Sequence, residues 1–201
     1  MMFVLRRLVP LTLLALILTG QGVSGYSICA EDGPDADEYA VYAALFAEKG
    51  YDKEGAQLVL ENGTVVNDTF SGHMDQTSIE KLFRMPPMKD AIDDFIKKNR
   101  KSSVLTDQFK LKATIVLITN SDVKRMFHDS IEGGWDLFHT KYPNAISIHT
   151  LSRVGFNKDK TAALVYYTYS CGGLCGQGQY VLLGKHDGQW KIEKESMTWI
   201  S

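Results

Sequence analysis

The chain has 201 residues, with 22 lysines and arginines, 24 aspartates and glutamates, and a formal net charge of −2. This balance excludes the basic excess that a nucleic-acid surface requires, so no nucleic-acid partner is expected. After the N-terminal segment, no apolar run is long enough for a membrane-spanning helix, and the mature chain is expected to lack one.

The N-terminus has the pattern of a secretory signal peptide. Arg6 and Arg7 form a basic start, and residues 8–19 form an apolar core that is short for a membrane span. Small or permissive residues before Tyr26 predict cleavage after Gly25, and therefore export to the periplasm or the exterior. An uncleaved anchor is the alternative, which the short core disfavours.

After the leader of residues 1–25, an acidic stretch with glycine and proline predicts a flexible lead-in over 26–37. The remainder, 38–201, is expected to be a single globular domain. It should open with a helix that Gly50 ends. The apolar residues that share this helix at helical spacing are Tyr39, Val41, Tyr42, Ala43, Leu45 and Phe46.

The next segments predict a hairpin and then helices. Residues 57–67 indicate two strands around an Asn62–Gly63 turn. A capping box at Thr77 begins a helical element that the prolines at 86–87 end. A further helix over 88–98 carries an apolar stripe of Ala91, Ile92, Phe95 and Ile96. A solvated C-terminal cap is favoured over an anion patch for Lys97, Lys98, Arg100 and Lys101.

Alternation of apolar residues predicts a strand over 109–119, with its second half covered on both sides. Ser121 is the expected cap of a short helix through Phe127. A longer helix follows, which contains Trp135 and ends before Pro143.

The last third predicts four strands, at 146–156, 161–170, 180–185 and 190–200. The second strand is apolar on both faces and should be central in its sheet. Short connections, including an Asp187–Gly188 turn, indicate an antiparallel meander. The expected fold is therefore α+β, with the N-terminal helices packed on one face of a C-terminal four-stranded antiparallel meander.

The segment YSCGGLCGQGQY, residues 169–180, joins the second and third strands of this meander. Cys171 and Cys175 flank a three-residue connection, so their side chains can meet at disulfide distance. Export to an oxidising compartment favours that pairing and leaves Cys29 over. We expect the glycines to supply positive φ angles for a tight ring. The glycines of this loop are Gly172, Gly173, Gly176 and Gly178.

Four other interpretations of the segment remain open. A redox site would prefer a Cys-x-x-Cys spacing at a helix start, and zinc would need one or two further ligands that the histidine spacing does not supply. A phosphate loop would need a third glycine and a following helix. A cysteine nucleophile has no local signature here. We therefore expect neither a metal nor a cofactor.

The C-terminal stretch resembles a pattern found in exported bacterial proteins of unassigned function. The shared segments are LSRVGFN (151–157), ALVYY (163–167), CGGLCGQGQYVLL (171–183), WKI (190–192) and the terminal WIS. The resemblance implies an exported domain and no activity. The order of helices and meander also looks similar, at the level of fold, to the cone folds related to nuclear transport factor 2.

Two functions compete on this evidence. The first is a non-catalytic binding or interaction domain with unknown partners, which recognises its ligand through exposed aromatic residues. The candidate aromatic residues are Tyr166, Tyr167, Tyr169, Trp190 and Trp199, although burial in the core is the favoured alternative for the tryptophans. The second is a hydrolase with a pocket between helices and sheet, for which no catalytic residue stands out.

Overall fold

The computed structural model describes residues 33–66, 79, 81 and 88–201. The predicted leader, Cys29, most of the lead-in and the capping box at Thr77 lie outside the described residues. Contacts group Asp32–Ser201 into one compact unit.

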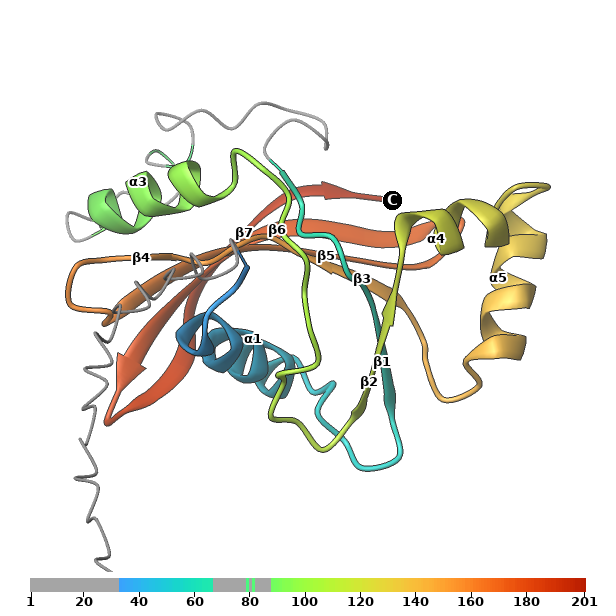
Figure 1. Cartoon of the computed structure of the whole chain (residues 1–201), viewed down its shortest axis with the longest axis horizontal. Coiled ribbons are helices and arrows are strands. Elements are labelled where there is room, and N and C mark those ends of the chain that lie inside the picture. Colours follow the sequence, from blue (N-terminus) through green and yellow to red (C-terminus); the bar gives the residue numbers. More distant parts are fainter. Residues whose placement is uncertain (1–32, 67–78, 80, 82–87) are drawn as a thin grey trace, which may run out of the picture. The chain divides into compact units, whose positions relative to one another are not determined.

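The described elements form an α+β fold around one mixed sheet (Figure 1). The helices are α1 (Ala36–Glu48), α3 (Lys89–Lys98), α4 (Asn120–Met126) and α5 (Ile131–Lys141). The strands are β1 (Gln57–Glu61), β2 (Thr114–Ile118), β3 (Ile148–Leu151), β4 (Gly155–Phe156), β5 (Ala162–Gly172), β6 (Cys175–His186) and β7 (Gln189–Ile200). The strand order is β2-β1-β3-β5-β6-β7, and β4 pairs with β5.

The predicted meander is present, but it is only part of the sheet. β3, β5, β6 and β7 pair in antiparallel order, and β5 is central as expected. β1 and β2 extend the sheet beyond β3, and β1 runs parallel to both of its neighbours. The prediction of a purely antiparallel four-stranded sheet is therefore corrected to a mixed sheet of seven strands within the described residues.

The hairpin predicted over 57–67 is wrong. β1 pairs with distant strands, and Gly63 forms a single bridge to Val104. The backbone N–H of Thr64 donates to the carbonyl oxygen of Ser103, and that of Val65 donates to Leu151. Asn62–Gly63 has the residues of a tight hairpin turn, but the residues on either side of it pair with distant segments. Long-range pairing therefore outweighs the local turn preference here.

The helices follow their local signals closely. α1 begins at Ala36, two residues inside the predicted lead-in, because Asp35 and Glu38 form a capping box. Gly50 follows its end with a φ of 76°. α4 is capped by Thr119 and not by Ser121. The strand predicted over 109–119 is shorter than expected, since regular pairing begins at Thr114.

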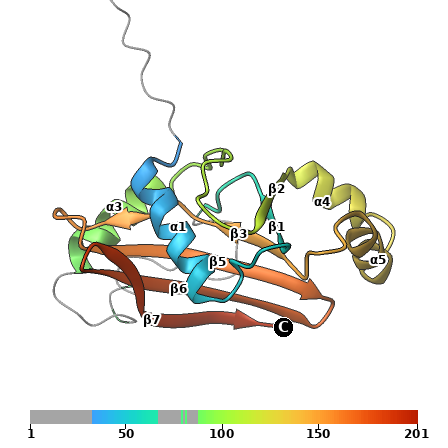
Figure 2. The ribbon, with the colours of Figure 1, turned by 90° about the horizontal axis from the view of Figure 1, so that it is seen from below.

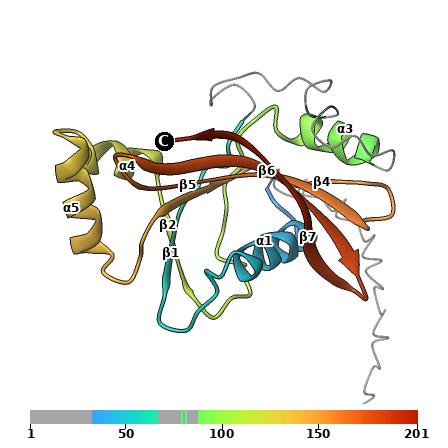
Figure 3. The same ribbon diagram turned by 180° about the vertical axis from the view of Figure 1, so that it is seen from behind.

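The helices cover both faces of the sheet, which corrects the prediction of one covered face. α1 packs over Ala163 and Val165 of β5. α3 packs on the opposite face over Leu164 and Leu182. Figure 2 shows α1 lying across β5 and β6, and in Figure 3 α3 and the α4–α5 pair lie at opposite ends of the sheet. Because successive residues of a strand point to opposite faces, the continuous apolar run of β5 supplies both cores.

A buried ion pair interrupts the predicted strand 146–156 between β3 and β4. Glu38 is fully buried, and its carboxylate accepts hydrogen bonds from the Arg153 guanidinium at 2.8 and 2.9 Å. It also accepts from the backbone N–H of Val154 at 2.8 Å. The backbone of Arg153 is held by the side-chain amide of Asn99, directly after α3. This network joins α1 and α3 to the link between β3 and β4. At that link it replaces the continuous strand pairing that was expected over 146–156.

Candidate functional site

The cysteine–glycine segment, predicted as a connecting loop within 169–180, belongs to β5 and β6 except for Gly173 and Leu174, and a disulfide closes this tight turn. Cys171 and Cys175 are bonded, with their Cα atoms 5.1 Å apart. Gly172 pairs with Cys175, so Cys171 is the extra residue of a bulge and residues 173–174 form the tip. The Leu174 side chain at this tip is 90% exposed. The predicted disulfide is thus formed, and both sulfurs are committed to it.

The glycines of this segment act differently from the prediction. Gly172 and Gly173 do not adopt positive φ angles. Instead, Gly176 and Gly178 make room for Trp199 of β7. A Cβ atom built on Gly178 would lie 2.0 Å from the indole nitrogen of Trp199, and one on Gly176 would lie 3.1 Å from its ring. The missing side chains therefore let the indole lie across β6.

Trp199 forms one side of a pocket of about 310 Å³ on the sheet face opposite α1, which we call the sheet pocket. Its floor consists of residues from β3 and β5, and α4 and α5 supply the other side. A hydrogen bond of 3.0 Å from its indole N–H to the hydroxyl of Tyr166 holds the Trp199 ring in place. The lining residues used below are Glu61, Phe127, Ile131, Trp135, Ile148, Thr150, Thr168, Ser170 and Trp199.

The side of the sheet pocket formed by the helices is aromatic and closely packed. The rings of Phe127 and Trp135 meet edge to face, with centroids 5.2 Å apart and planes at 74°. Gly134 permits this contact, because a Cβ atom there would lie 2.2 Å from the Phe127 ring. Ile131 is 56% exposed beside them and reaches the disulfide turn, where a Cβ atom on Gly173 would lie 3.4 Å from it.

The floor of the sheet pocket carries hydroxyl groups in register. Thr150 and Thr168 are cross-strand partners, and their hydroxyl oxygens are 2.5 Å apart. Ser170 is the cross-strand partner of Ile148, two residues further along each strand and on the same face. Glu61, the last residue of β1, adds a carboxylate to the lining. The sheet pocket therefore combines apolar sides with a few polar groups that converge on one space, the usual composition of small-molecule sites.

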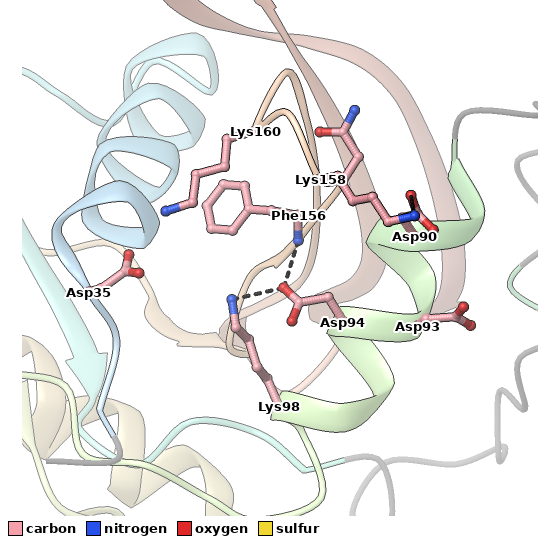
Figure 4. A pocket seen from close by; sticks show the side chains of 9 residues that line it. Asp35, Asp90, Asp93, Asp94, Lys98, Phe156, Lys158 and Lys160 are labelled. Atoms are coloured by element: carbon pink, nitrogen blue, oxygen red, sulfur yellow. Dashed lines mark hydrogen bonds and ion pairs between the residues drawn. The ribbon is translucent and has the colours of Figure 1, made fainter. Parts of the chain in front are cut away.

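A second depression, of about 410 Å³, lies between α3 and the β4–β5 turn (Figure 4). Its lysines and aspartates largely neutralise one another. The Lys98 ammonium is 2.9 Å from the Asp94 carboxylate and also donates to the carbonyl of Val154, and Asp94 accepts from the backbone N–H of Phe156. Lys98 is thus a tertiary link and not only a solvated helix cap. We interpret this depression as structural.

Sequence reasoning did not single out a buried polar relay on the α1 face. His149 is 1% exposed, and its ring nitrogens are 2.8 Å from the Ser147 hydroxyl and 2.9 Å from the Tyr167 hydroxyl. Burial lowers the pKa of His149 to about 3, so the ring is neutral. One feature of the sequence indicated its burial: His149 lies two residues before the buried Leu151, so both point to the same face of the strand. Ser147 and Tyr167 are also buried, which assigns the relay to the core.

The aromatic residues proposed as exposed contacts separate into two groups. Tyr166, Tyr167 and Trp190 belong to the core, as the alternative interpretation held. Tyr169 is partly buried against the α1-side core. Trp199 alone of the five lines the sheet pocket. The sequence had therefore named one pocket residue, and it missed Phe127, Thr150, Thr168 and Glu61.

No family model, curated protein or solved structure matches the chain. The two resemblances drawn from the sequence stay predictions. Within residues 33–66 and 88–201, no group of three or more histidine, cysteine or acidic side chains is arranged to hold a metal ion. No helix in the same part of the chain is long and apolar enough to span a membrane.

Proposed function

We propose that the protein is an exported, non-catalytic binding domain that takes a small, largely apolar ligand into the sheet pocket. The observation that carries the proposal is the aromatic enclosure over a hydroxyl-bearing floor. The leader pattern and the Cys171–Cys175 disulfide support export, because disulfides persist in oxidising compartments.

The sheet pocket is a built feature of the fold and not an incidental gap. Gly178 accommodates the Trp199 indole, and Gly134 accommodates the Phe127 ring. Thr168 is 5% exposed and belongs to the pocket floor, where its hydroxyl is bonded to that of Thr150. The volume of the sheet pocket, about 310 Å³, lies at the lower end of the range for small-molecule sites, which favours a ligand of modest size.

The alternative function, a hydrolase, receives less support from the same geometry. The hydroxyls of Thr150 and Thr168 are bonded to each other and not to a general base. No histidine is among the described residues that line the sheet pocket, and His149 points to the opposite face of β3. The enzyme alternative predicts turnover of simple ester or amide substrates, whereas the binding proposal predicts none.

Heteronuclear NMR of the full exported chain with a library of neutral and charged fragments tests the proposal. The protein has three tryptophans, and their indole N–H signals are built-in reporters. Trp135 and Trp199 line the pocket, while Trp190 packs in the α1-side core. We expect binding fragments to shift the first two signals and leave the third unchanged.

A Ser170→Phe variant, which fills the pocket, should abolish these shifts. Thr161→Phe, at an exposed position just before β5, is the matched control and should retain them. Fragments that shift all three signals equally, or shift none, would contradict the proposal. Steady ester hydrolysis that Ser170→Phe removes would favour the enzyme instead.

A further inference from the structure

The carboxylate of Glu61 has no counter-ion in the described part of the chain. Among the described residues it accepts one hydrogen bond, a long contact of 3.4 Å from the side-chain amide of Asn120. Glu61 is partly buried at the end of β1 and lines the sheet pocket. None of the described residues that line this pocket is a lysine, an arginine or a histidine. As far as the described residues go, the pocket therefore carries an uncompensated negative charge.

The aromatic residues of the sheet pocket favour the same sign of ligand charge. The faces of Phe, Tyr and Trp rings carry negative partial charge and attract ammonium groups, and the attraction strengthens where water is excluded. Phe127 and Trp135 meet at 74° and form a corner, so that a ligand in the corner can contact a ring face and a ring edge. Trp199 adds a third ring from β7.

The contrast with the charged depression near α3 strengthens this argument. There Asp94 has Lys98 at 2.9 Å and Asp90 has Lys158 at 3.5 Å, so these two carboxylates have lysine partners within the same lining. Glu61 is a carboxylate in a pocket that lacks such a partner in the described residues. A bound cation would supply the missing charge.

We propose that the ligand of the sheet pocket is a small organic ammonium ion with an apolar body. Its charged group lies beside Glu61 and the rings of Phe127, Trp135 and Trp199, and its polar substituents reach the hydroxyls of Thr168 and Ser170. This proposal rests on the proposed binding function and adds the sign of the ligand's charge.

Calorimetric and NMR titrations with choline and benzyltrimethylammonium test whether the pocket prefers a positively charged ligand. The uncharged control is the isostere 3,3-dimethyl-1-butanol, in which carbon replaces the nitrogen of choline. We expect the cations to bind at millimolar concentration or more tightly, and the isostere to bind at least about tenfold more weakly. Raising the ionic strength should weaken the cations more than the isostere, because salt screens charge attraction.

Glu61→Gln keeps the shape of the side chain and removes its charge. It should weaken cation binding by about tenfold and leave the isostere unchanged. Glu132→Gln, on the exposed first turn of α5 and outside the pocket lining, is the matched control and should change neither. Thermal unfolding of both variants establishes that they are folded.

The failure of this inference can be told from failure of the binding function. Neutral fragments that shift the Trp135 and Trp199 signals, with cations no better than their isostere, would refute the charge preference and keep the binding domain. Absence of binding by the whole cation series at millimolar concentration would also refute it. Cation binding that Glu61→Gln does not weaken would overturn the assigned role of Glu61.

Discussion

The two faces of the β3–β5 strand pair both carry polar residues, but those on one face are sealed in the core and those on the other line a pocket. His149 and Tyr167 point to the face under α1, where they are buried and bonded to each other. Thr150 and Thr168, the next residue along each strand, point to the other face and line the sheet pocket. Alternation along a strand places these pairs back to back.

The difference shows that coverage of a sheet face by helices, and not the type of residue, decides whether its polar groups are structural or can contact a ligand. α1 seals its face with Phe46 and Tyr42, so each polar atom there must find an internal partner. On the other face α3 and the α4–α5 pair occupy the two ends of the sheet, and the pocket lies beside α4–α5. Thr150 is partly exposed there, and Thr168, which is bonded to it, lines the pocket floor.

The strongest test of the sealed face is Glu38→Gln. It removes the buried carboxylate that pairs with the Arg153 guanidinium, which should lower the free energy of unfolding by about 3–5 kcal/mol. Urea unfolding followed by circular dichroism measures this change. Glu48→Gln, exposed on the same helix, should stay within about 0.5 kcal/mol of the parent. A similar small loss for both variants would show that the network is not a structural link.

The buried histidine predicts a dependence of stability on pH. The folded-state pKa of His149 is lowered to about 3 from 6.5, so the unfolded chain binds a proton that the folded chain refuses between these values. The stability due to neutral His149 is therefore present above pH 6.5 and is lost as pH falls towards 3.

By pH 5 this loss should reach about 2 kcal/mol. Urea unfolding at a series of pH values measures it against His149→Gln, which does not titrate. The variant should be less stable at neutral pH and show a flatter decline. Parallel curves for the two proteins would assign the acid sensitivity to other groups.

Reduction of the Cys171–Cys175 disulfide should act mainly on the pocket face. A ring this small stabilises the fold by about 2 kcal/mol, chiefly by restricting the unfolded chain. Reduction should also shift the NMR signals of Ile131 and Trp199, which lie near the turn, and leave those of His149 in place. Changes spread evenly over both faces would contradict a local role for the turn.

The smallest expected effects come from removing one hydroxyl on each face. Tyr167→Phe leaves His149 with an unpaired ring nitrogen in the core and should cost about 1–2 kcal/mol. Thr168→Val removes the hydroxyl bonded to Thr150, which is partly exposed and whose own hydroxyl can bind water instead, so it should cost only about 0.5 kcal/mol. Thermal and urea unfolding of the two variants measures the difference directly. Equal losses would mean that the pocket floor is as tightly packed as the core.

The candidate site could be predicted only in fragments. Cys171 and Cys175 were paired from their spacing and the expected export, because a tight connection between adjacent strands brings their Cβ atoms together whatever the rest of the fold does. The role of Gly178 could not be inferred in this way, since it depends on Trp199, a residue of the next strand. Glu61 and Thr168 are 107 positions apart in the chain and meet only through the sheet.

The sequence by itself determined the elements whose signals are local. These are the body of α1 with Gly50 at its end, the apolar stripe of α3, the strands of the meander, and the disulfide-closed turn. Their energies arise from neighbours within a few residues, so the pattern of residues is sufficient to predict them. Only the tertiary structure decided that β1 runs parallel to β2 and β3 and does not form the expected hairpin. It also decided that helices cover both faces of the sheet. Parallel pairing joins segments far apart in the chain, and long-range packing selects it over the local turn.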